Sequence, residues 1–303
     1  MTATTTAASR DDVRSALRSA PPARPRRARR GLWIATIVAY LVTFVILLPL
    51  LWIVLLSFRS SDDILVHPLS ASHLTTANYR TVVQTLNLLL MYRNTLILAL
   101  VSVVVGVVIS FMASFALTRM VFRRRRTRMQ RTLRFYFLAG LAVPVYILLF
   151  PVYRLDLQFH LFGTYAALIL PYIATQIPFN VLLLTGFLAD FPDDIEQAAV
   201  IDGVGLFSLC ARVVFPLMRP VLATLLVLNI IYVWNEFPFA ITLINKPSLT
   251  TVSLGASQFQ GQWATDYGAE MAAAVLVLLP QLAVFALFQR QVIEGMTLGA
   301  VKG

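Results

Sequence analysis

Six long apolar stretches constrain this chain more than any other feature of its sequence. They are Leu32–Leu56, Thr95–Thr118, Phe135–Tyr153, Leu161–Ala189, Val221–Ile244 and Met271–Gln289. A helix that crosses the hydrocarbon core of a bilayer needs about 20 predominantly apolar residues. Hydrophobic residues make up 58% of the chain and charged residues 13%, whereas soluble domains average about 45–50% and about 25%. The sequence therefore predicts an all-α polytopic membrane protein with six transmembrane helices.

The basic residues predict how these spans are oriented. Six spans put both chain termini on one side, and that side would carry 20 of the 25 Lys and Arg residues. Because basic residues collect in cytoplasmic segments, we expect both termini to be cytoplasmic. The run Arg123–Arg126 could also be a nucleic-acid patch, but membrane topology and anionic lipid account for it. We therefore expect no nucleic-acid partner.

The remaining composition separates the chain into three parts and excludes several kinds of chemistry. We expect the basic arm, residues 1–31, to be disordered, residues 32–290 to form the transmembrane domain, and residues 291–303 to be a cytoplasmic tail. The sequence has neither a phosphate-binding loop of the Gly-x-x-x-x-Gly-Lys-Ser/Thr type nor a Cys/His spacing typical of a metal site. We expect a transporter with no catalytic residue, metal or cofactor of its own.

The segment 190–217, between the fourth and fifth spans, has the clearest local pattern. Asp193 is the expected N-cap of a short helix, and Glu196 follows at the capping-box spacing. Gly203 stands where a glycine commonly ends a helix. These residues predict a short helix on the cytoplasmic side of the membrane.

A second short helix is predicted directly after it. Gly205 continues the turn, and Leu206–Phe215 can form a helix that ends before Pro216. Ala198 and Ala199, on the first helix, would leave one face small enough for another protein to approach closely. The alternative is an ordinary interfacial loop that covers the helix bundle.

The same segment resembles the signature of a transporter family. The order Gln197-Ala198-Ala199, three residues, Gly203, nine residues and Val213-x-Phe215-Pro216 is similar to the Glu-Ala-Ala, Gly, Ile-x-Leu-Pro signature of permease subunits of binding-protein-dependent ABC importers. Asp202 also resembles that family. In it, this segment is the coupling helix pair that docks on the ATPase subunit. The resemblance implies the type I ABC importer transmembrane fold, with a permease core at about residues 90–290.

The signature has one substitution with a chemical consequence. Gln197 stands where the family has Glu. A salt bridge to the ATPase would therefore become a neutral hydrogen bond, unless Glu196 supplies the charge instead.

Two further pieces resemble carbohydrate importers of the maltose type. Trp234-Asn235-Glu236-Phe237 looks like a run in the fifth span of sugar-importer permeases. The last nine residues are similar to the tail of the second permease subunit of maltose-type importers, which reaches into the ATPase dimer. That likeness implies ATPase contacts at Gly295, Gly299 and Lys302.

The resemblance implies both a function and a set of partners. The chain would be a permease subunit that moves a monosaccharide or oligosaccharide across the inner membrane of a prokaryote. Its partners would be membrane lipid, a homologous permease in a heterodimer, two ATPase subunits that bind ATP and Mg²⁺, and an external solute-binding protein. The alternatives are an importer of another small solute, an ion-coupled secondary transporter and, with less support, an intramembrane enzyme.

Polar residues in the fifth span mark a candidate substrate path. Asn229, Tyr232 and Glu236 recur at helical spacing and would share one helix face. An ionisable residue inside a span is a functional hypothesis by default, so this face could meet sugar hydroxyls. The alternative is that Glu236 bonds another helix or the partner subunit. On the outer side, family resemblance implies that the loop Asn245–Glu270 meets the binding protein, and we expect a short helix within Ser57–Asn94.

Overall fold

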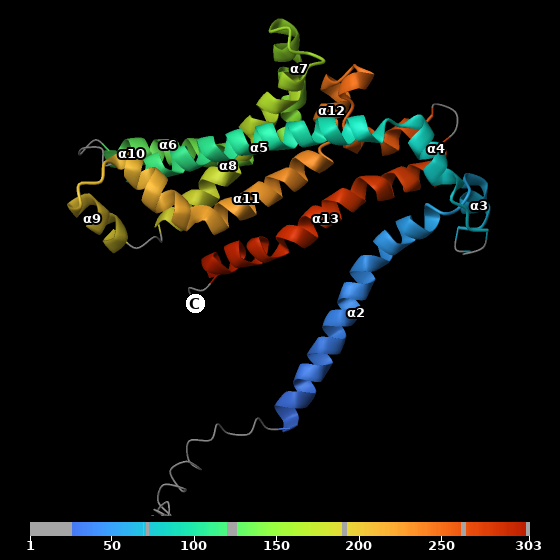
Figure 1. Cartoon of the computed structure of the whole chain (residues 1–303), viewed down its shortest axis with the longest axis horizontal. Coiled ribbons are helices and arrows are strands. Elements are labelled where there is room, and N and C mark those ends of the chain that lie inside the picture. The colour runs from blue at the N-terminus through green and yellow to red at the C-terminus, as the bar shows by residue number, and fades with distance from the viewer. Residues whose placement is uncertain are drawn as a thin grey trace, which may run out of the picture. The chain divides into compact units, whose positions relative to one another are not determined.

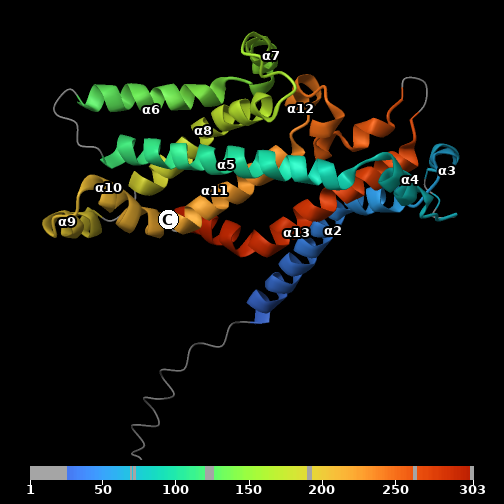
Figure 2. The same ribbon diagram turned by 45° about the horizontal axis from the view of Figure 1, so that its top comes forward.

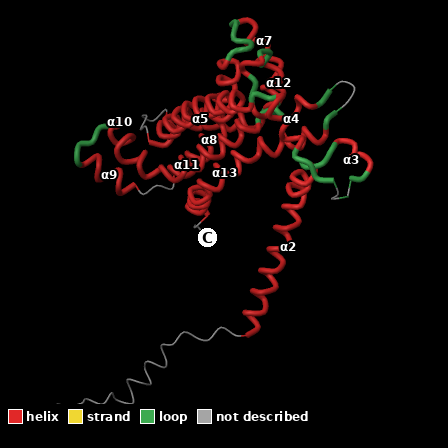
Figure 3. Tube along the Cα trace, turned by 45° about the vertical axis from the view of Figure 1, so that its right-hand side comes forward, coloured by secondary structure: helices red, strands yellow, loops and turns green. Residues whose placement is uncertain are grey.

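The computed structural model describes residues 26–68, 70, 73–119, 126–189, 193–261 and 265–300, and most of them are helical (Figure 1). Within these ranges, strand-like pairing is limited to one isolated bridge between Gln260 and Thr265. Figure 3 shows helices joined by loops throughout the described chain. The chain divides into two compact units, Met1–Trp52 and Ile53–Gly303. The prediction of an all-α protein is confirmed.

In the described parts of the chain, five unbroken helical segments are long and apolar enough to cross a membrane. They contain α2 (Arg26–Leu56), α5 (Leu88–Arg119), α8 (Tyr165–Ala189), the continuous run Leu206–Asn235 that ends with α11 (Phe215–Asn235), and α13 (Tyr267–Ala300). Each corresponds to one predicted span. Hydroxyl side chains on the buried side of α5 bond back to their own helix, as in the 2.7 Å bond from Ser110 Oγ to the Gly106 carbonyl oxygen. Such bonds satisfy hydroxyl groups that could form no hydrogen bond with lipid chains.

The third predicted span, Phe135–Tyr153, is not one helix. The chain forms α6 (Arg126–Ala142), the 3₁₀ turn η1 (Val145–Leu148) and α7 (Leu149–Gln158), with a bend of 90° between the two arms. Pro144 explains the break, because proline lacks an N–H and disfavours helical geometry in the residue before it. Figure 2 shows α7 turned away from the axis of α6. The third predicted span is therefore a bent pair of helices, and if this pair is one span the described residues contain six spans.

Several predicted boundaries also differ from the structure. Helix α8 begins at Tyr165 rather than at residue 161, because the chain first turns at Gly163, whose φ is +69°. Helix α11 ends at Asn235, and α12 (Pro238–Leu243) follows it. Helix α13 continues to Ala300, so the predicted tail 291–303 is helical as far as it is described. Helix α2 begins at Arg26, so the last six residues of the arm predicted to be disordered are helical.

Short elements lie in the connection before α5 and in the connection before α13. Helices α3 (Ser61–Val66) and α4 (Ala77–Thr85) follow α2 in the sequence and precede α5. The connection before α13 carries the 3₁₀ turns η3 (Pro247–Leu249), η4 (Val252–Leu254) and η5 (Ala256–Phe259). The prediction of a short helix within the loop before α5 is confirmed.

The main core lies where α5, α8 and α11 pack together. Val103, Leu184 and Leu225 are fully buried there. Gly106 allows α5 to approach α8 closely, because a Cβ atom added at this glycine would overlap the side chain of Gln176. Gln176 Nε2 in turn donates to the Ser102 carbonyl oxygen at 2.8 Å. Small residues and interhelical hydrogen bonds of this kind commonly hold membrane helices together.

A second packed region joins α3, α4 and the beginning of α13. Arg59 is completely buried and pairs with Asp63 at 2.8 Å. Asn78 Nδ2 donates to the carbonyl oxygens of Ser57 and Arg59 at 2.8 and 2.7 Å. Gly268 lies against this network, since an added Cβ would be 2.5 Å from the Arg59 carbonyl oxygen. The charge of Arg59 is therefore enclosed by hydrogen bonds, and α13 packs against them.

We expect Gly268→Ala to destabilise the protein despite the higher helix propensity of alanine. The methyl group would overlap backbone and the Asn78 amide, and overpacking of this kind costs about 1–3 kcal/mol. Gly186→Ala is the matched control, because Gly186 is helical and has no atom within 4 Å of an added Cβ. The apparent melting temperature of detergent-purified protein should fall for the first variant only. Equal melting temperatures would contradict the close packing at Gly268.

Candidate functional site

A helical hairpin lies at the end of the bundle where α5 and α8 finish (Figure 2). It consists of α9 (Asp193–Ile201) and α10 (Leu206–Ser208). Between them Gly203 has a φ of +74°, a backbone conformation that favours glycine. The N–H of Val204 donates to the Ala199 carbonyl oxygen at 3.0 Å and closes the helix end. The predicted helix terminus at Gly203 is confirmed.

The beginning of α9 is attached to the bundle by an ion pair. Arg119 Nε, in the last turn of α5, lies 2.6 Å from Glu196 Oε1, and each side chain is only 12% exposed. Arg119 Nη2 also donates to the Leu188 carbonyl oxygen in α8 at 2.6 Å. This arrangement joins α5, α8 and α9 through one guanidinium group. Asp193 begins α9, but its side chain is outside the described part of the structure, so its predicted N-cap role stays a prediction.

The Arg119 contact also bears on the expected exchange of roles between Glu196 and Gln197. The Glu196 carboxylate is engaged within the chain, whereas Gln197 is exposed. The Glu196 carboxylate is therefore not free in this structure to replace the acid that position 197 lacks.

The second helix of the hairpin does not end before Pro216. Helix α10, the π-helical segment η2 (Leu209–Val214) and α11 run on as one continuous helix to Asn235. The N–H of Phe215 donates to the Cys210 carbonyl oxygen, five residues back. This change in hydrogen-bond register falls directly before Pro216, which has no N–H to donate. The register change lets the helix continue through Pro216, so the prediction of a separate helix Leu206–Phe215 was wrong.

The hairpin presents a small exposed surface with apolar residues on it. Gln197, Ala198 and Asp202 are exposed, as are Gly203 and Gly205, whereas Ala199 packs partly against the core. Ile201 and Phe207 are 85% and 83% exposed. We call the four residues Gln197, Ala198, Ile201 and Phe207 the docking surface. Sequence analysis missed Phe207; the available signal was a large aromatic residue two positions after the turn glycine Gly205.

Glu236 does not lie on the α11 helix face that the sequence predicted. The helix ends one residue earlier, and Glu236 has an extended backbone. Its carboxylate accepts a 2.6 Å hydrogen bond from the Tyr172 hydroxyl and bonds of 2.8 and 3.1 Å from the N–H groups of Phe239 and Ala240. Glu236 therefore caps the first turn of α12 and ties it to α8. The prediction that Glu236 shares one face of α11 with Asn229 was wrong. The alternative, a bond from Glu236 to another helix, agrees with the structure, because Tyr172 belongs to α8.

Asn229 and Tyr232 line a cavity of about 310 Å³ between α8, α11 and η1. Thr175, Gln176 and Phe179 line it from α8. The cavity thus combines amide and hydroxyl groups with aromatic rings. Amides and hydroxyls can exchange hydrogen bonds with a neutral polyol, because they both donate and accept.

Two amides beside this cavity have unused hydrogen-bonding capacity. Asn229 Nδ2 donates to Asn180 Oδ1 at 2.9 Å, which joins α11 to α8. Among the described residues, Gln176 Oε1 and Asn180 Nδ2 have no partner although both atoms are buried. Sequence analysis missed both α8 residues, since hydropathy and spacing within one helix do not reveal which polar residues of another helix will face it.

The remaining candidate residues are placed as follows. Gly295 and Gly299 lie in the last part of α13, and Lys302 lies outside the described residues. Pro216 lies in the first turn of α11. In the described parts of the chain, no group of three or more His, Cys, Asp or Glu side chains is arranged to hold a metal ion.

Comparison with known proteins places this arrangement in a family. A permease from Caldicellulosiruptor sp. (strain Rt8B.4), the putative ABC transporter permease protein ORF2, is 35% identical over 84% of this chain and 91% of its own length. The trehalose transport system permease protein SugB of Mycobacterium tuberculosis is 30% identical, over 91% of this chain and 99% of its own.

A solved structure has the same fold. A chain of a bacterial ABC transporter involved in the import of the acidic polysaccharide alginate superposes with a TM-score of 0.71 at 17% identity, over 89% of this chain and 99% of that one. The sequence profile of the binding-protein-dependent transport system inner membrane component matches residues 106–297. The match contains α9, α10, the cavity and most of α13, and this chain therefore belongs to the family of binding-protein-dependent transport system inner membrane components.

Proposed function

We propose that this chain is the permease subunit of an ABC importer that moves a sugar, either a monosaccharide or an oligosaccharide, across the cytoplasmic membrane. The observation that carries the proposal is the α9–α10 hairpin, which exposes the docking surface and is tied to two long helices by Arg119. A relative that is 30% identical over most of both chains is named for trehalose transport, which supports a sugar as substrate.

The hairpin provides a mechanical connection between an ATPase and the transmembrane helices. In the proposed cycle, ATP binding closes a pair of ATPase subunits that hold the docking surface. The pull on α9 passes through Glu196 and Arg119 to the ends of α5 and α8. The change from an inward-facing to an outward-facing bundle then follows, provided that the ATPase binds the two states with different affinity.

The proposal requires partners that perform the chemistry. Two ATPase subunits would bind ATP and Mg²⁺, a homologous permease would complete the membrane part as a heterodimer, and an external solute-binding protein would deliver the sugar. Both termini would lie in the cytoplasm. Gln197 would then contribute a neutral hydrogen bond to the ATPase, and Gly295, Gly299 and Lys302 would contact it from the end of the chain. The chain itself would catalyse no reaction.

The cavity between α8 and α11 is the proposed contact with the sugar. Asn229 and Tyr232 line it together with Gln176, whose Oε1 has no hydrogen-bond partner among the described residues and can accept a hydrogen bond from a hydroxyl group. Phe179 supplies an apolar ring on the same wall. Glu236 supports this site indirectly, because it fixes the chain directly after α11.

Two alternatives keep the fold but change the function. The same importer could carry another small solute, which competition by unlabelled solutes in an uptake assay would reveal. An ion-coupled secondary transporter would need no ATPase, and its uptake would depend on a proton or sodium gradient. Uptake that requires both ATP and the binding protein would support our proposal.

We expect Gly203→Val to reduce substrate-stimulated ATP hydrolysis in the assembled, reconstituted complex. A β-branched residue is strained at the positive φ of this turn, at a cost of about 1–2 kcal/mol, which corresponds to a factor of about 5–30 in the population of the native turn. Gly203→Asn is the matched control, because asparagine tolerates this conformation. Unchanged sugar uptake by Gly203→Val, or equal losses in both variants, would contradict the role of the turn.

We expect Tyr232→Ala to lower sugar uptake while the melting temperature stays near that of the wild type. Tyr232 is only partly buried and lies on the cavity wall, so its removal deprives the sugar of a ring and a hydroxyl. Glu236→Gln is the contrasting variant. It loses the charge that strengthens three hydrogen bonds and should lower the melting temperature, since bonds to charged groups contribute about 1.5–3 kcal/mol. Normal uptake by Tyr232→Ala would exclude this cavity from the sugar path.

A further inference from the structure

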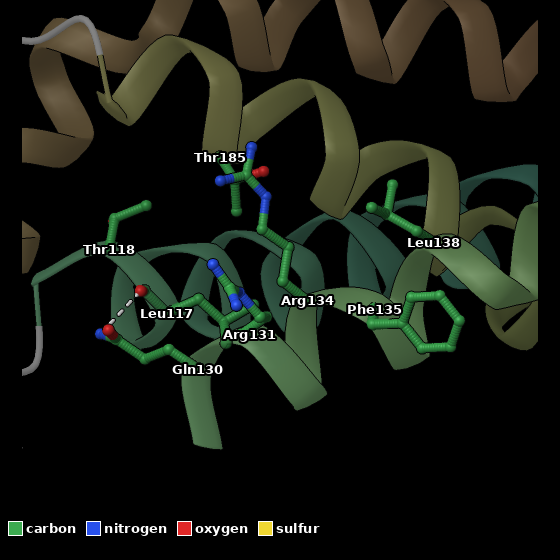
Figure 4. Close-up of a pocket in the computed structure, with 8 residues that line it drawn as sticks. All are labelled: Leu117, Thr118, Gln130, Arg131, Arg134, Phe135, Leu138 and Thr185. Carbon is green, nitrogen blue, oxygen red and sulfur yellow. Dashed lines mark hydrogen bonds between the residues drawn. The ribbon is translucent and has the colours of Figure 1, made fainter. Parts of the chain in front are cut away.

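A basic cavity lies between the ends of α5, α6 and α8, apart from both sites described above (Figure 4). Its volume is about 420 Å³. Arg131 and Arg134 line it from α6, Thr118 from α5 and Thr185 from α8. In Figure 4 the guanidinium group of Arg134 extends from α6 to a position beside Thr185. Because Arg131 and Arg134 are three residues apart on one helix, they share a face.

Neither arginine has a counter-charge among the described residues. In the described ranges, the ion pairs of the chain join Arg59 to Asp63 and Arg119 to Glu196, and neither involves Arg131 or Arg134. Two guanidinium groups on one cavity wall match a phosphate well, because each can donate two parallel N–H bonds to its oxygens. The cavity therefore has the charge of an anion site without an anion supplied by the described part of the chain.

The hydroxyl groups in the cavity favour a headgroup that donates hydrogen bonds. Thr118 Oγ1 donates its proton to the Ser114 carbonyl oxygen at 2.8 Å, and Thr185 Oγ1 donates to the Val181 carbonyl oxygen at 2.7 Å. Each hydroxyl oxygen is thus left as an acceptor. A phosphoglycerol headgroup has a phosphate that could bind the arginines and two free hydroxyls that could donate hydrogen bonds to the threonines.

The other wall of the cavity is apolar. Leu117, Phe135 and Leu138 line it, and Phe135 is 69% exposed. Phe135 and Leu138 lie nine and twelve residues from the beginning of α6, which is about 14 and about 18 Å along the helix axis. The polar residues that line the cavity lie closer to the ends of their helices, within eight residues or about 12 Å. That depth corresponds to the boundary between headgroups and hydrocarbon in a bilayer. An acyl chain could therefore follow the apolar wall while the phosphate stays at the arginines.

We propose that this cavity binds one anionic phospholipid of the phosphatidylglycerol type, with its phosphate between Arg131 and Arg134. Gln130 Nε2 donates to the Leu117 carbonyl oxygen at 3.0 Å, and this bond joins the beginning of α6 to the end of α5 beside the cavity. Basic pockets between transmembrane helices bind anionic lipid headgroups in this manner.

The test compares lipid binding by variants of the full chain, purified in detergent and measured by native mass spectrometry with phosphatidylglycerol and phosphatidylcholine of identical acyl chains. We expect the wild type to prefer phosphatidylglycerol. The variant R131Q/R134Q should lose this preference by about 25-fold, or about fivefold for each arginine. The matched control R93Q/R154Q removes two exposed arginines from α5 and α7 outside the cavity and should keep the preference.

Three results would overturn the proposal. Unchanged preference in R131Q/R134Q would exclude the arginines, and an equal loss in R93Q/R154Q would indicate nonspecific attraction. If R131Q/R134Q instead loses a co-purified protein subunit while its lipid preference persists, the cavity serves a protein carboxylate.

A second measurement keeps the proposal testable if R131Q/R134Q does not fold. The variant R131K/R134K retains both charges but not the paired donors, and it should bind phosphatidylglycerol more weakly than the wild type. Thermal stabilisation of the wild type by phosphatidylglycerol, and not by inorganic phosphate, would support a lipid. Equal stabilisation by inorganic phosphate would show a site for small anions and contradict the proposal.

Discussion

Backbone N–H and C=O groups inside a bilayer must find partners within the protein, because lipid offers none. In the described residues, the break after Pro144 and the break after α11 interrupt apolar spans, and the requirement is met differently at each. After Pro144, the N–H of Ile147 bonds back to the proline carbonyl oxygen at 3.0 Å in a 3₁₀ turn. After α11, the Glu236 carboxylate accepts the first free N–H groups of α12. The carboxylate accepts hydrogen bonds from two such N–H groups and from the Tyr172 hydroxyl. The helix can therefore break here without leaving these N–H groups unpaired.

Both interruptions border the same cavity. Val145, directly after the first break, and Tyr232, one turn before the second, are on its wall. At the first break the chain changes direction by 90° between α6 and α7, so no straight helix continues past the cavity. Polar side chains from α8 can then remain beside a space of about 310 Å³ instead of a packed interface. The breaks therefore connect the backbone requirement of a membrane protein to the position of its proposed sugar path.

Hydropathy and turn chemistry predicted the spans and the turn at Gly203, but not where the helices break. Proline alone was no guide, since Pro171, Pro178 and Pro280 lie inside long helices whereas Pro144 ends one. Which outcome occurs depends on whether neighbouring groups can satisfy the freed carbonyls, and those groups come from distant parts of the chain. The same limit applies to Glu236 and Tyr172, which are 64 residues apart in sequence yet form one hydrogen bond.

Arginine residues that lie close together at one end of the bundle have different surroundings. Arg119 is mostly buried against Glu196, whereas Arg131 and Arg134 have no such partner among the described residues. The two arrangements meet in the last turn of α5, where Leu117 and Thr118 line the basic cavity and Arg119 holds the docking hairpin. A lipid headgroup in that cavity would fix this turn relative to the membrane surface. The hairpin would then move against an anchored helix end, so that force from an ATPase would displace the bundle and not merely the end of α5.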